Sequence, residues 1–241
     1  MCKKFTEMKL MRKSYRGIPA SEGMGTGKVV NIDCSSPAFK DKKIRDTDRE
    51  LGRFVRALKT YCNNTRDEIQ YIKETIGEQE SKILAGHIQM THDPHMQSEL
   101  IRKIGEGICA ERATSEICDE FINRFLEADV EFVKQIATDV KDVKAGVITL
   151  LLGKEKIPVE HFDEDVIVVT KELTPSVAAR LDRARTKAIV TEIGSPNSHS
   201  ALLLKAMNIP SVTSIKDADK LFKDGDTVTV NGDSGEVFEA E

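Results

Sequence analysis

The sequence predicts a small α/β domain that is interrupted by an all-helical subdomain. Three observations support this fold class: a strand-like stretch near the N-terminus, a long central run of amphipathic helical patterns, and buried-strand patterns that return after Gly153. The first strand of the α/β domain is therefore expected to come from the N-terminus. We predict that residues 1–33 and 154–241 form the α/β domain and that residues 34–153 form the helical subdomain.

The first strand is predicted from about Gly27 to Ile32, after the glycine-rich turn in YRGIPASEGMGTGKVVNI. These glycines raise the question of a phosphate-binding loop. A P-loop requires a glycine, four further residues and then Gly-Lys-Ser/Thr, but here the first position is Glu22 and Val29 follows the lysine. The stretch is therefore interpreted as the entry to a strand.

The helical region begins in DTDRELGRFVRALKTYC, where apolar residues from Leu51 to Cys62 fall at helical spacing. Thr47 and Glu50 make a plausible capping box at its start. Breaks are expected near Asp93-Pro94 and Gly105–Gly107, and consecutive amphipathic helices with short connections predict an antiparallel helical subdomain. The further helices are predicted in EQESKILAGHIQM, in HMQSELIRKIGEG, and in CAERATSEICDEFINRFLEADVEFVKQIATDV with its continuation to about Leu152.

After Gly153 the pattern changes to short β-branched runs. DEDVIVVTKEL contains a buried-strand run at Val166 to Val169, and TKAIVTEI contains another at Ala188 to Ile193. SALLLKAM predicts a helix, and DTVTVNGDSGEVFEA predicts a strand, a glycine turn and a strand. These elements complete the α/β domain.

The composition narrows the class of protein. A formal charge of −4 and a pI near 5.8 argue against a nucleic-acid binder, which usually has a basic surface, and favour a basic protein partner. No apolar run is long enough to span a bilayer, and the N-terminus lacks the apolar core of a secretory signal. The five cysteines have no CxxC spacing and are odd in number, which indicates a reducing cytoplasm.

Three histidines near the middle of the chain lie close enough in sequence to raise the question of a metal site. His87, His92 and His95 are separated by five and three residues, and Asp93-Pro94 breaks the helix between them. Helical ligand pairs are instead spaced four residues apart. We therefore expect no metal here and interpret these as surface or interface histidines.

His199 stands at the change from a polar loop to an apolar helix in GSPNSHSALLLKAM. The positive end of the helix dipole disfavours protonation of an imidazole, which leaves a neutral nucleophilic nitrogen. The next backbone amides, with the hydroxyls of Ser198 and Ser200, could hold an anion beside the ring, which suits a phosphoryl acceptor. A histidine that caps a helix or fills a pocket fits the local sequence about equally well, whereas the GxSxG of a serine hydrolase is absent.

The stretch TEIGSPNSHSALLLKAMNIPSV resembles the phosphohistidine segment of the phosphoenolpyruvate-utilising enzymes. Four further stretches resemble Enzyme I of the bacterial sugar phosphotransferase system, in the same order along nearly the whole chain. They are YRGIPASEGMGTGKV, ILAGHIQMTHDPHM, ATDVKDV and VIVVTKELTPS.

The resemblance implies an α/β phosphohistidine (swivelling) domain interrupted by an all-α helical bundle that docks the phosphocarrier protein HPr. His199 would take a phosphoryl group from phosphoenolpyruvate through Nε2 and pass it to a histidine of HPr. The residues that would support this site are Asn197, Ser198, Ser200 and Thr174. The resemblance also implies contacts with HPr by Glu78, Met90, Asp93, Met96, Phe125 and Phe132.

The chain ends at Glu241, after a match to the family's stop of this half. The resemblance implies a further C-terminal barrel that binds phosphoenolpyruvate and magnesium and mediates dimerisation of the full-length protein. We therefore expect this fragment to need no cofactor, to exchange phosphate with phospho-HPr, and not to use phosphoenolpyruvate. A cytoplasmic location is expected.

Two alternatives remain open at this stage. A non-catalytic or divergent carrier-binding module is suggested because Ser195, Pro196 and Asn197 replace the family's usual residues before the histidine, and because Ala178 replaces a threonine that usually contacts it. The phosphohistidine domain of a pyruvate phosphate dikinase or a phosphoenolpyruvate synthase would share the chemistry. It is disfavoured because those proteins lack this helical insertion.

Overall fold

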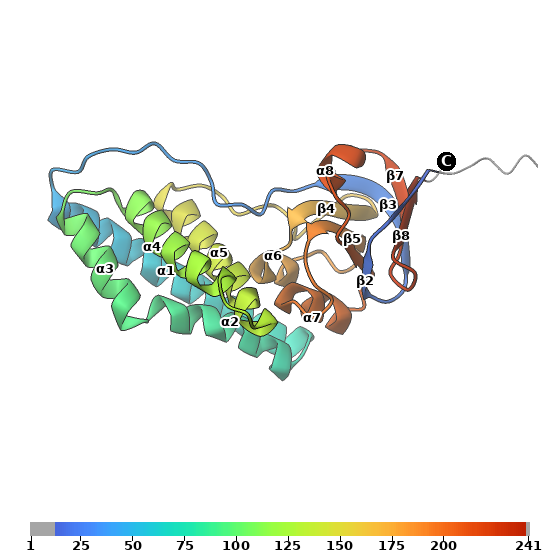
Figure 1. The fold of residues 1–241 in the computed structure, drawn as a ribbon, viewed down its shortest axis with the longest axis horizontal. Coiled ribbons are helices and arrows are strands. Elements are labelled where there is room, and N and C mark those ends of the chain that lie inside the picture. Colours follow the sequence, from blue (N-terminus) through green and yellow to red (C-terminus); the bar gives the residue numbers. More distant parts are fainter. Residues whose placement is uncertain (1–12, 240–241) are drawn as a thin grey trace, which may run out of the picture.

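The computed structural model describes residues 13–239, apart from the side chains of Glu131 and Phe132. It is elongated, with a bundle of helices at one end and a mixed sheet at the other (Figure 1). The predicted fold class, an α/β domain interrupted by a helical subdomain, is confirmed. Within the described residues, no helix is long and apolar enough to cross a membrane.

The predicted elements occur in the predicted order along the chain, together with further short strands and helices. The strands are β1 (Ser14–Arg16), β2 (Ile18–Ser21), β3 (Met24–Asn31), β4 (Val166–Glu172), β5 (Thr186–Ile193), β6 (Ser211–Thr213), β7 (Thr227–Asn231) and β8 (Glu236–Glu239). The helices are α1 (Thr47–Thr75), α2 (Glu78–Thr91), α3 (Pro94–Gly105), α4 (Ala110–Leu126), α5 (Glu131–Leu151), α6 (Pro175–Ala179), α7 (His199–Ala206) and α8 (Ala218–Leu221).

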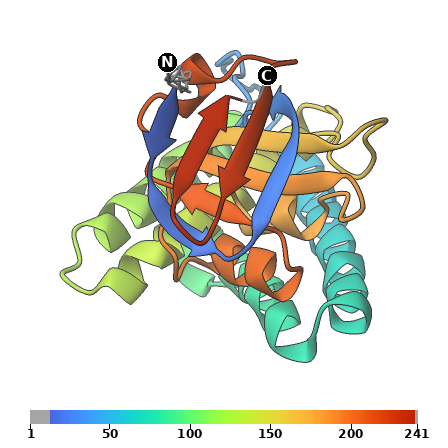
Figure 2. The ribbon, with the colours of Figure 1, turned by 90° about the vertical axis from the view of Figure 1, so that its right-hand side faces the viewer.

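The strands of the described chain form one sheet in the order β1-β8-β7-β3-β4-β5-β6-β2 (Figure 2). The central strands β3, β4, β5 and β6 are parallel, and the outer pairs are antiparallel. Because β3 and β4 are parallel neighbours, the chain must cross back between them. Helices α1 to α5 lie within this single connection, so the N-terminal strand does share a sheet with the strands that follow the insertion.

Alternate residues of β4 enter two different apolar cores, as the pleat of a strand requires. Val166 and Val168 pack in the cluster that contains α6 and α7, whereas Ile167 and Val169 pack in the cluster that contains Phe222. Burial on both faces explains why this strand is a continuous apolar run.

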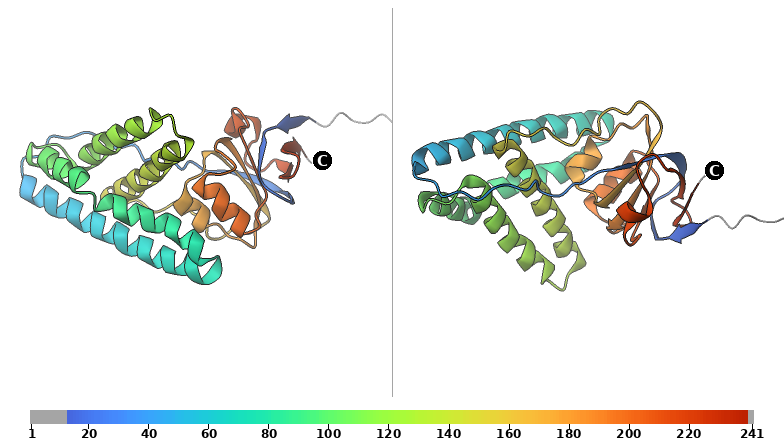
Figure 3. Two further views of the ribbon diagram at one scale, coloured as in Figure 1. Left: turned by 60° about the horizontal axis from the view of Figure 1, so that its bottom comes forward. Right: turned by 90° about the horizontal axis from the view of Figure 1, so that it is seen from above.

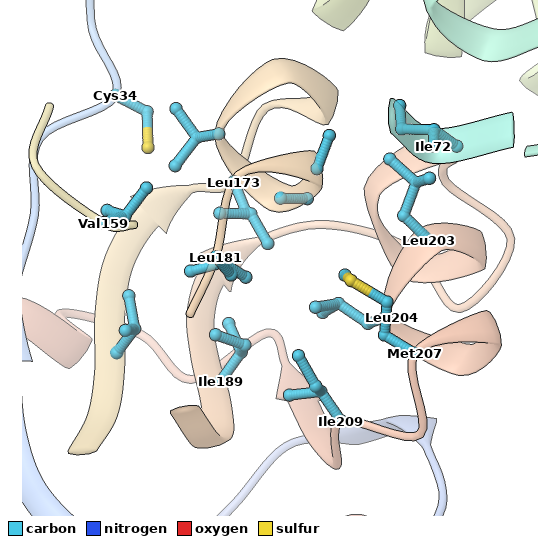
Figure 4. Packing of buried hydrophobic residues seen from close by; sticks show 14 of the residues in the cluster. Cys34, Ile72, Val159, Leu173, Leu181, Ile189, Leu203, Leu204, Met207 and Ile209 are labelled. Carbon is cyan, nitrogen blue, oxygen red and sulfur yellow. The ribbon is translucent and has the colours of Figure 1, made fainter. Parts of the chain in front are cut away.

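The helical subdomain is attached to the sheet domain through a shared core. Ile72 of α1 and Leu84 of α2 are fully buried in the same cluster as Leu203 of α7. Figure 4 shows Ile72 and Leu203 in this cluster. The end of α1 and the start of α2 approach α7 in two further views (Figure 3). The interdomain contact therefore positions α7, the helix that begins at His199.

Truncating this interdomain core is expected to destabilise the whole chain. Leu84→Ala should lower the free energy of unfolding by about 3 kcal/mol, because it removes a fully buried side chain and leaves a cavity. Leu126→Ala, at a leucine that is 48% exposed, is the matched control. Denaturant unfolding measures both, and equal small losses would contradict the packing of α2 against the α/β domain.

The connection between α4 and α5 corrects the prediction of one helix continuing from Cys109 to about Leu152. The helix instead ends at Leu126 and restarts at Glu131. The two helices then run antiparallel, so that Cys118 and Ile122 of α4 pack against Val140 of α5. A continuous helix would have left both apolar faces exposed to water.

The start of α1 also differs from the predicted capping box. Asp46, and not Thr47, is the N-cap, and its side chain accepts a hydrogen bond from the Arg49 amide at 3.0 Å. Glu50 is buried and accepts hydrogen bonds from the Arg53 guanidinium and from the Ala110 amide. Its carboxylate therefore joins α1 to the start of α4.

Candidate functional site

His199 is the first residue of α7, as the sequence predicted. It follows the loop that leaves the carboxyl end of β5. Ser198 is the N-cap, and its hydroxyl accepts a hydrogen bond from the Ala201 amide at 3.3 Å. The His199 side chain is 23% exposed, so a part of the ring is open to solvent and a part contacts the helical subdomain.

The partner of the His199 ring is Asp139 of α5, in the helical subdomain. Nδ1 of the ring lies 2.9 Å and 3.1 Å from the two carboxylate oxygens. An ionised carboxylate only accepts hydrogen bonds, so Nδ1 must carry a proton. Within the described residues no hydrogen bond reaches Nε2, and in the neutral ring its lone pair is available. The interdomain contact thus selects which nitrogen can act as a nucleophile.

A second histidine lies on the other side of Asp139. His87 of α2 is fully buried, and its Nε2 is 3.6 Å from the nearer Asp139 oxygen. Its Nδ1 is 4.0 Å from an oxygen of Asp142, one turn further along α5. Of the two predicted alternatives, a surface or an interface histidine, the surface position is wrong for His87, because its face of α2 packs on α5. His92 and His95 are exposed, as predicted.

Asp142 extends this buried cluster to α6. Its carboxylate accepts hydrogen bonds from the Ser176 amide at 2.7 Å and from the Ser176 hydroxyl at 2.6 Å. Ser176 is in the first turn of α6, where backbone amides have no helical partner. The two aspartates of α5 therefore tie the helical subdomain to the starts of α6 and α7. No group of three or more histidine, cysteine or acidic residues between 13 and 239 is arranged to hold a metal ion.

Burial and the neighbouring charged groups shift the pKa values of Asp139 and His87 in opposite directions. Burial alone raises the pKa of Asp139, but the hydrogen bond from His199 and then the nearby His87 ring lower it below 3.8 overall. Burial alone lowers the pKa of His87, whereas the adjacent carboxylates of Asp139 and Asp142 raise it above 6.5 overall. The pKa of each group is thereby shifted in the direction that favours its charged form.

The stability of the fold should depend on pH through these groups. Since the pKa of Asp139 is lower in the folded state, its contribution is present above pH 3.8 and is lost as the pH falls through the folded value. Since the pKa of His87 is raised, its contribution is present below pH 6.5 and is lost as the pH rises through the folded value. Urea unfolding across this range should show both losses. Asp139→Asn should weaken the acidic loss, and an unchanged acid limb would contradict the assignment.

The other residues predicted at the site are only partly brought together. The Ser200 hydroxyl is 3.2 Å from that of Ser198, so these two serines form one pair at the start of α7. Asn197 is exposed, and its backbone N–H donates a hydrogen bond to the Ser195 hydroxyl. Thr174 is the N-cap residue of α6, but its buried hydroxyl has no hydrogen-bond partner among the described residues. Its support of His199 stays a prediction.

The predicted docking residues have different exposures. Glu78 is exposed at the start of α2, and Met90 and Phe125 are half-buried. Asp93 is engaged as the N-cap of α3, accepting a hydrogen bond from the Met96 amide at 2.8 Å. Met96 itself is only 5% exposed because it packs in the core of the helical bundle, which corrects its assignment to a docking surface. The predicted contact at Phe132 lies outside the described side chains.

A cavity of about 460 Å³ near the centre of the molecule does not include His199. It lies between α1, α5 and α6 and is lined by Tyr61, Asp142 and Thr174, among others. The exposed part of the His199 ring is therefore placed to meet a group that arrives from outside the chain.

Sequence reasoning did not assign Asp139, Asp142 or His87 to the site. The first two stand in ATDVKDV, three residues apart on a helix face that is otherwise apolar. Buried acids at that spacing signal a shared partner, because charged side chains are rarely buried unless they are paired. His87 stands in the apolar stripe of α2, a position at which a buried side chain is expected.

The fold and the histidine together define a class: an α/β domain with a helical insertion that presents an imidazole at a helix start. Both parts match family models of phosphoenolpyruvate-utilising enzymes, the N-terminal model over residues 16–135 and the mobile-domain model over residues 162–235. The chain belongs to this family of phosphoenolpyruvate-utilising enzymes. The predicted resemblance is confirmed.

Curated relatives carry the name phosphoenolpyruvate-protein phosphotransferase. The protein of Bacillus sp. (strain S) is 31% identical over 234 residues, that of Enterococcus faecalis 32% over 234 residues, and that of Lactococcus lactis subsp. lactis 34% over 234 residues. Each alignment covers 95% of this chain and 40% of the relative. The chain thus spans about 40% of the length of these relatives.

Two solved structures share the fold. An NMR solution structure of Enzyme I has a TM-score of 0.71 at 24% identity, covering 93% of this chain and 92% of that one. The N-terminal domain of Enzyme 1 - Nitrogen has a TM-score of 0.62 at 22% identity, with the same coverage. Both show that the interrupted α/β architecture is the shared feature.

Proposed function

We propose that His199 carries a phosphoryl group from phosphoenolpyruvate to a histidine of the phosphocarrier HPr, and that this chain alone exchanges phosphate with HPr. One observation carries the proposal: Asp139 accepts the Nδ1 proton of His199, which leaves Nε2 as the free nucleophilic nitrogen of a partly exposed ring. The family membership supports the reaction class.

In the whole protein, the Nε2 lone pair attacks the phosphorus of phosphoenolpyruvate. The N–P bond forms as the P–O bond to the enol oxygen breaks, and the enolate leaves as pyruvate after it takes up a proton. Nδ1 keeps its proton throughout, so no base has to remove one from the ring. Asp139 stabilises the positive charge that the ring gains as the N–P bond forms.

In the second transfer, from His199 to HPr, the His199 nitrogen is the leaving group instead of the nucleophile. A neutral nitrogen of the HPr histidine attacks the phosphorus, the N–P bond to His199 breaks, and its electron pair returns to Nε2. The phosphoryl oxygens carry the charge in both steps, so the backbone amides in the first turn of α7 are suited to stabilise them. The Ser198 and Ser200 hydroxyls lie at the same end of α7.

The proposed reaction separates phosphate exchange with HPr, on this chain, from the binding of phosphoenolpyruvate, on the rest of the protein. We propose that a C-terminal barrel binds phosphoenolpyruvate with magnesium and makes the full-length protein a homodimer, and that the present part acts without a cofactor. Exposed acidic and half-buried apolar side chains, Glu78, Met90 and Phe125, would face a partner with a basic rim. A cytoplasmic location belongs to the same proposal.

Exchange with phospho-HPr is the experiment that tests this function. The chain, incubated with ³²P-labelled phospho-HPr, should take up acid-labile phosphate, and incubation with phosphoenolpyruvate and magnesium alone should give none. A carrier-binding module without catalysis would instead bind HPr and take up no label between pH 6 and 8. Uptake from phosphoenolpyruvate alone would show that the division of tasks is wrong.

A further inference from the structure

His87 is a fully buried ionisable group that the transfer steps do not use. Neither of its ring nitrogens has a hydrogen-bond partner among the described residues, although one lies 3.6 Å from Asp139 and the other 4.0 Å from Asp142. The other ionisable groups near it are Glu68 of α1 and, beyond Asp139, His199 of α7. Anionic groups therefore approach it from α1 and α5.

The positions of the Asp139 and Asp142 carboxylates favour the imidazolium form of His87 over the neutral ring. A neutral imidazole has one N–H and one lone pair, so either tautomer would direct a lone pair at Asp139 or at Asp142. The imidazolium directs an N–H at each carboxylate. The two aspartates are 3% and 4% exposed, and buried carboxylates of this kind require a compensating positive charge. His87 is the group that is placed to supply it to both.

We propose that His87 is a positioning residue: a buried imidazolium that keeps Asp139 ionised and thereby holds His199 in the tautomer with a bare Nε2. The effect of His87 on phosphate transfer rests on the proposed function, whereas the contacts of its ring with the two carboxylates do not depend on that function. It adds a third member to the pair already described, in the order His87, Asp139, His199, with each member on a different helix.

The physical reason is the response of Asp139 when the positive charge is removed. A buried carboxyl group without a cation tends to take up a proton. A protonated Asp139 would donate its hydrogen bond to Nδ1 of His199, which would move the ring proton to Nε2. The nitrogen that has to attack phosphorus would then carry a hydrogen, and transfer would be slow.

The first test is made on the unphosphorylated chain and needs no carrier. Long-range ¹H–¹⁵N correlation spectra at pH 7 should show both nitrogens of His87 protonated, and should show His199 protonated at Nδ1 when its ring is neutral. A neutral His87 at this pH would overturn the inference. Because this readout does not depend on transfer, it stands even where uptake from phospho-HPr fails, a result that would overturn the proposed function alone.

The second test uses His87→Gln, with His161→Gln at an exposed histidine before β4 as the control. The first variant should move the neutral His199 ring toward the Nε2-protonated tautomer and slow phosphate exchange by roughly 100-fold, the effect of a mispositioned reacting group. It should also change the pH profile of exchange, which a merely structural loss would leave in place. An unchanged tautomer and an unchanged pH profile in folded His87→Gln would overturn the inference.

Discussion

The variant His199→Ala is expected to take up no acid-labile phosphate from phospho-HPr under conditions in which the wild-type chain is fully labelled. The loss should be complete, because a phosphoryl group held on nitrogen has no substitute attachment at this position. Radiolabel uptake followed by acid treatment measures the effect.

The matched control is His95→Ala, at an exposed histidine of α3 whose ring lies 6.0 Å from that of Phe121. It should be labelled to the same extent as the wild type. Label that survived in His199→Ala would place the phosphoryl group on another residue and would end the assignment of His199. Circular dichroism of both variants shows whether the fold is retained.

Asp139→Asn is expected to slow the exchange by roughly 10²- to 10³-fold, the loss found when a group that stabilises charge developing in the transition state is removed. The amide can still accept a hydrogen bond from Nδ1, but it carries no charge to stabilise the ring as the N–P bond forms. It also offers an NH₂ group that can donate to Nδ1 and favour the wrong tautomer. Quench-flow exchange with phospho-HPr measures the rate.

Asp119→Asn is the control for this variant. Asp119 is an acid of α4 that pairs with Lys144 at 2.8 Å and is 49% exposed. Its variant should exchange phosphate at the wild-type rate. If Asp139→Asn did the same while remaining folded, the His199–Asp139 contact would be incidental, and the selection of Nε2 would need another cause.

The fold could be predicted because each element carries its own local pattern. The helices show apolar stripes at helical spacing, and β4 shows a continuous β-branched run that only a strand buried on both faces explains. The break between α4 and α5 could not be predicted in the same way. No glycine or proline stands between Leu126 and Glu131, and the reversal is favoured by packing between the two helices, which a local pattern does not contain.

The site could be predicted only in part. His199 was found because a helix start is a local signal, visible in the change from Gly194–Ser198 to the apolar run. Its partner was not found, because Asp139 is 60 residues earlier in the chain and the two meet only when the helical subdomain packs on the α/β domain. The sequence does not distinguish a surface from an interface position for His87 for the same reason, since its burial depends on the contact between α2 and α5.

The most direct measurement of the central claim is the position of the phosphoryl group on the ring. After exchange with phospho-HPr, long-range ¹H–¹⁵N spectra of the labelled chain should show phosphorus bonded to Nε2 of His199, with the Nδ1 proton retained and hydrogen-bonded. Phosphorus at Nδ1 would contradict the account, because that nitrogen is the one that Asp139 engages in this structure.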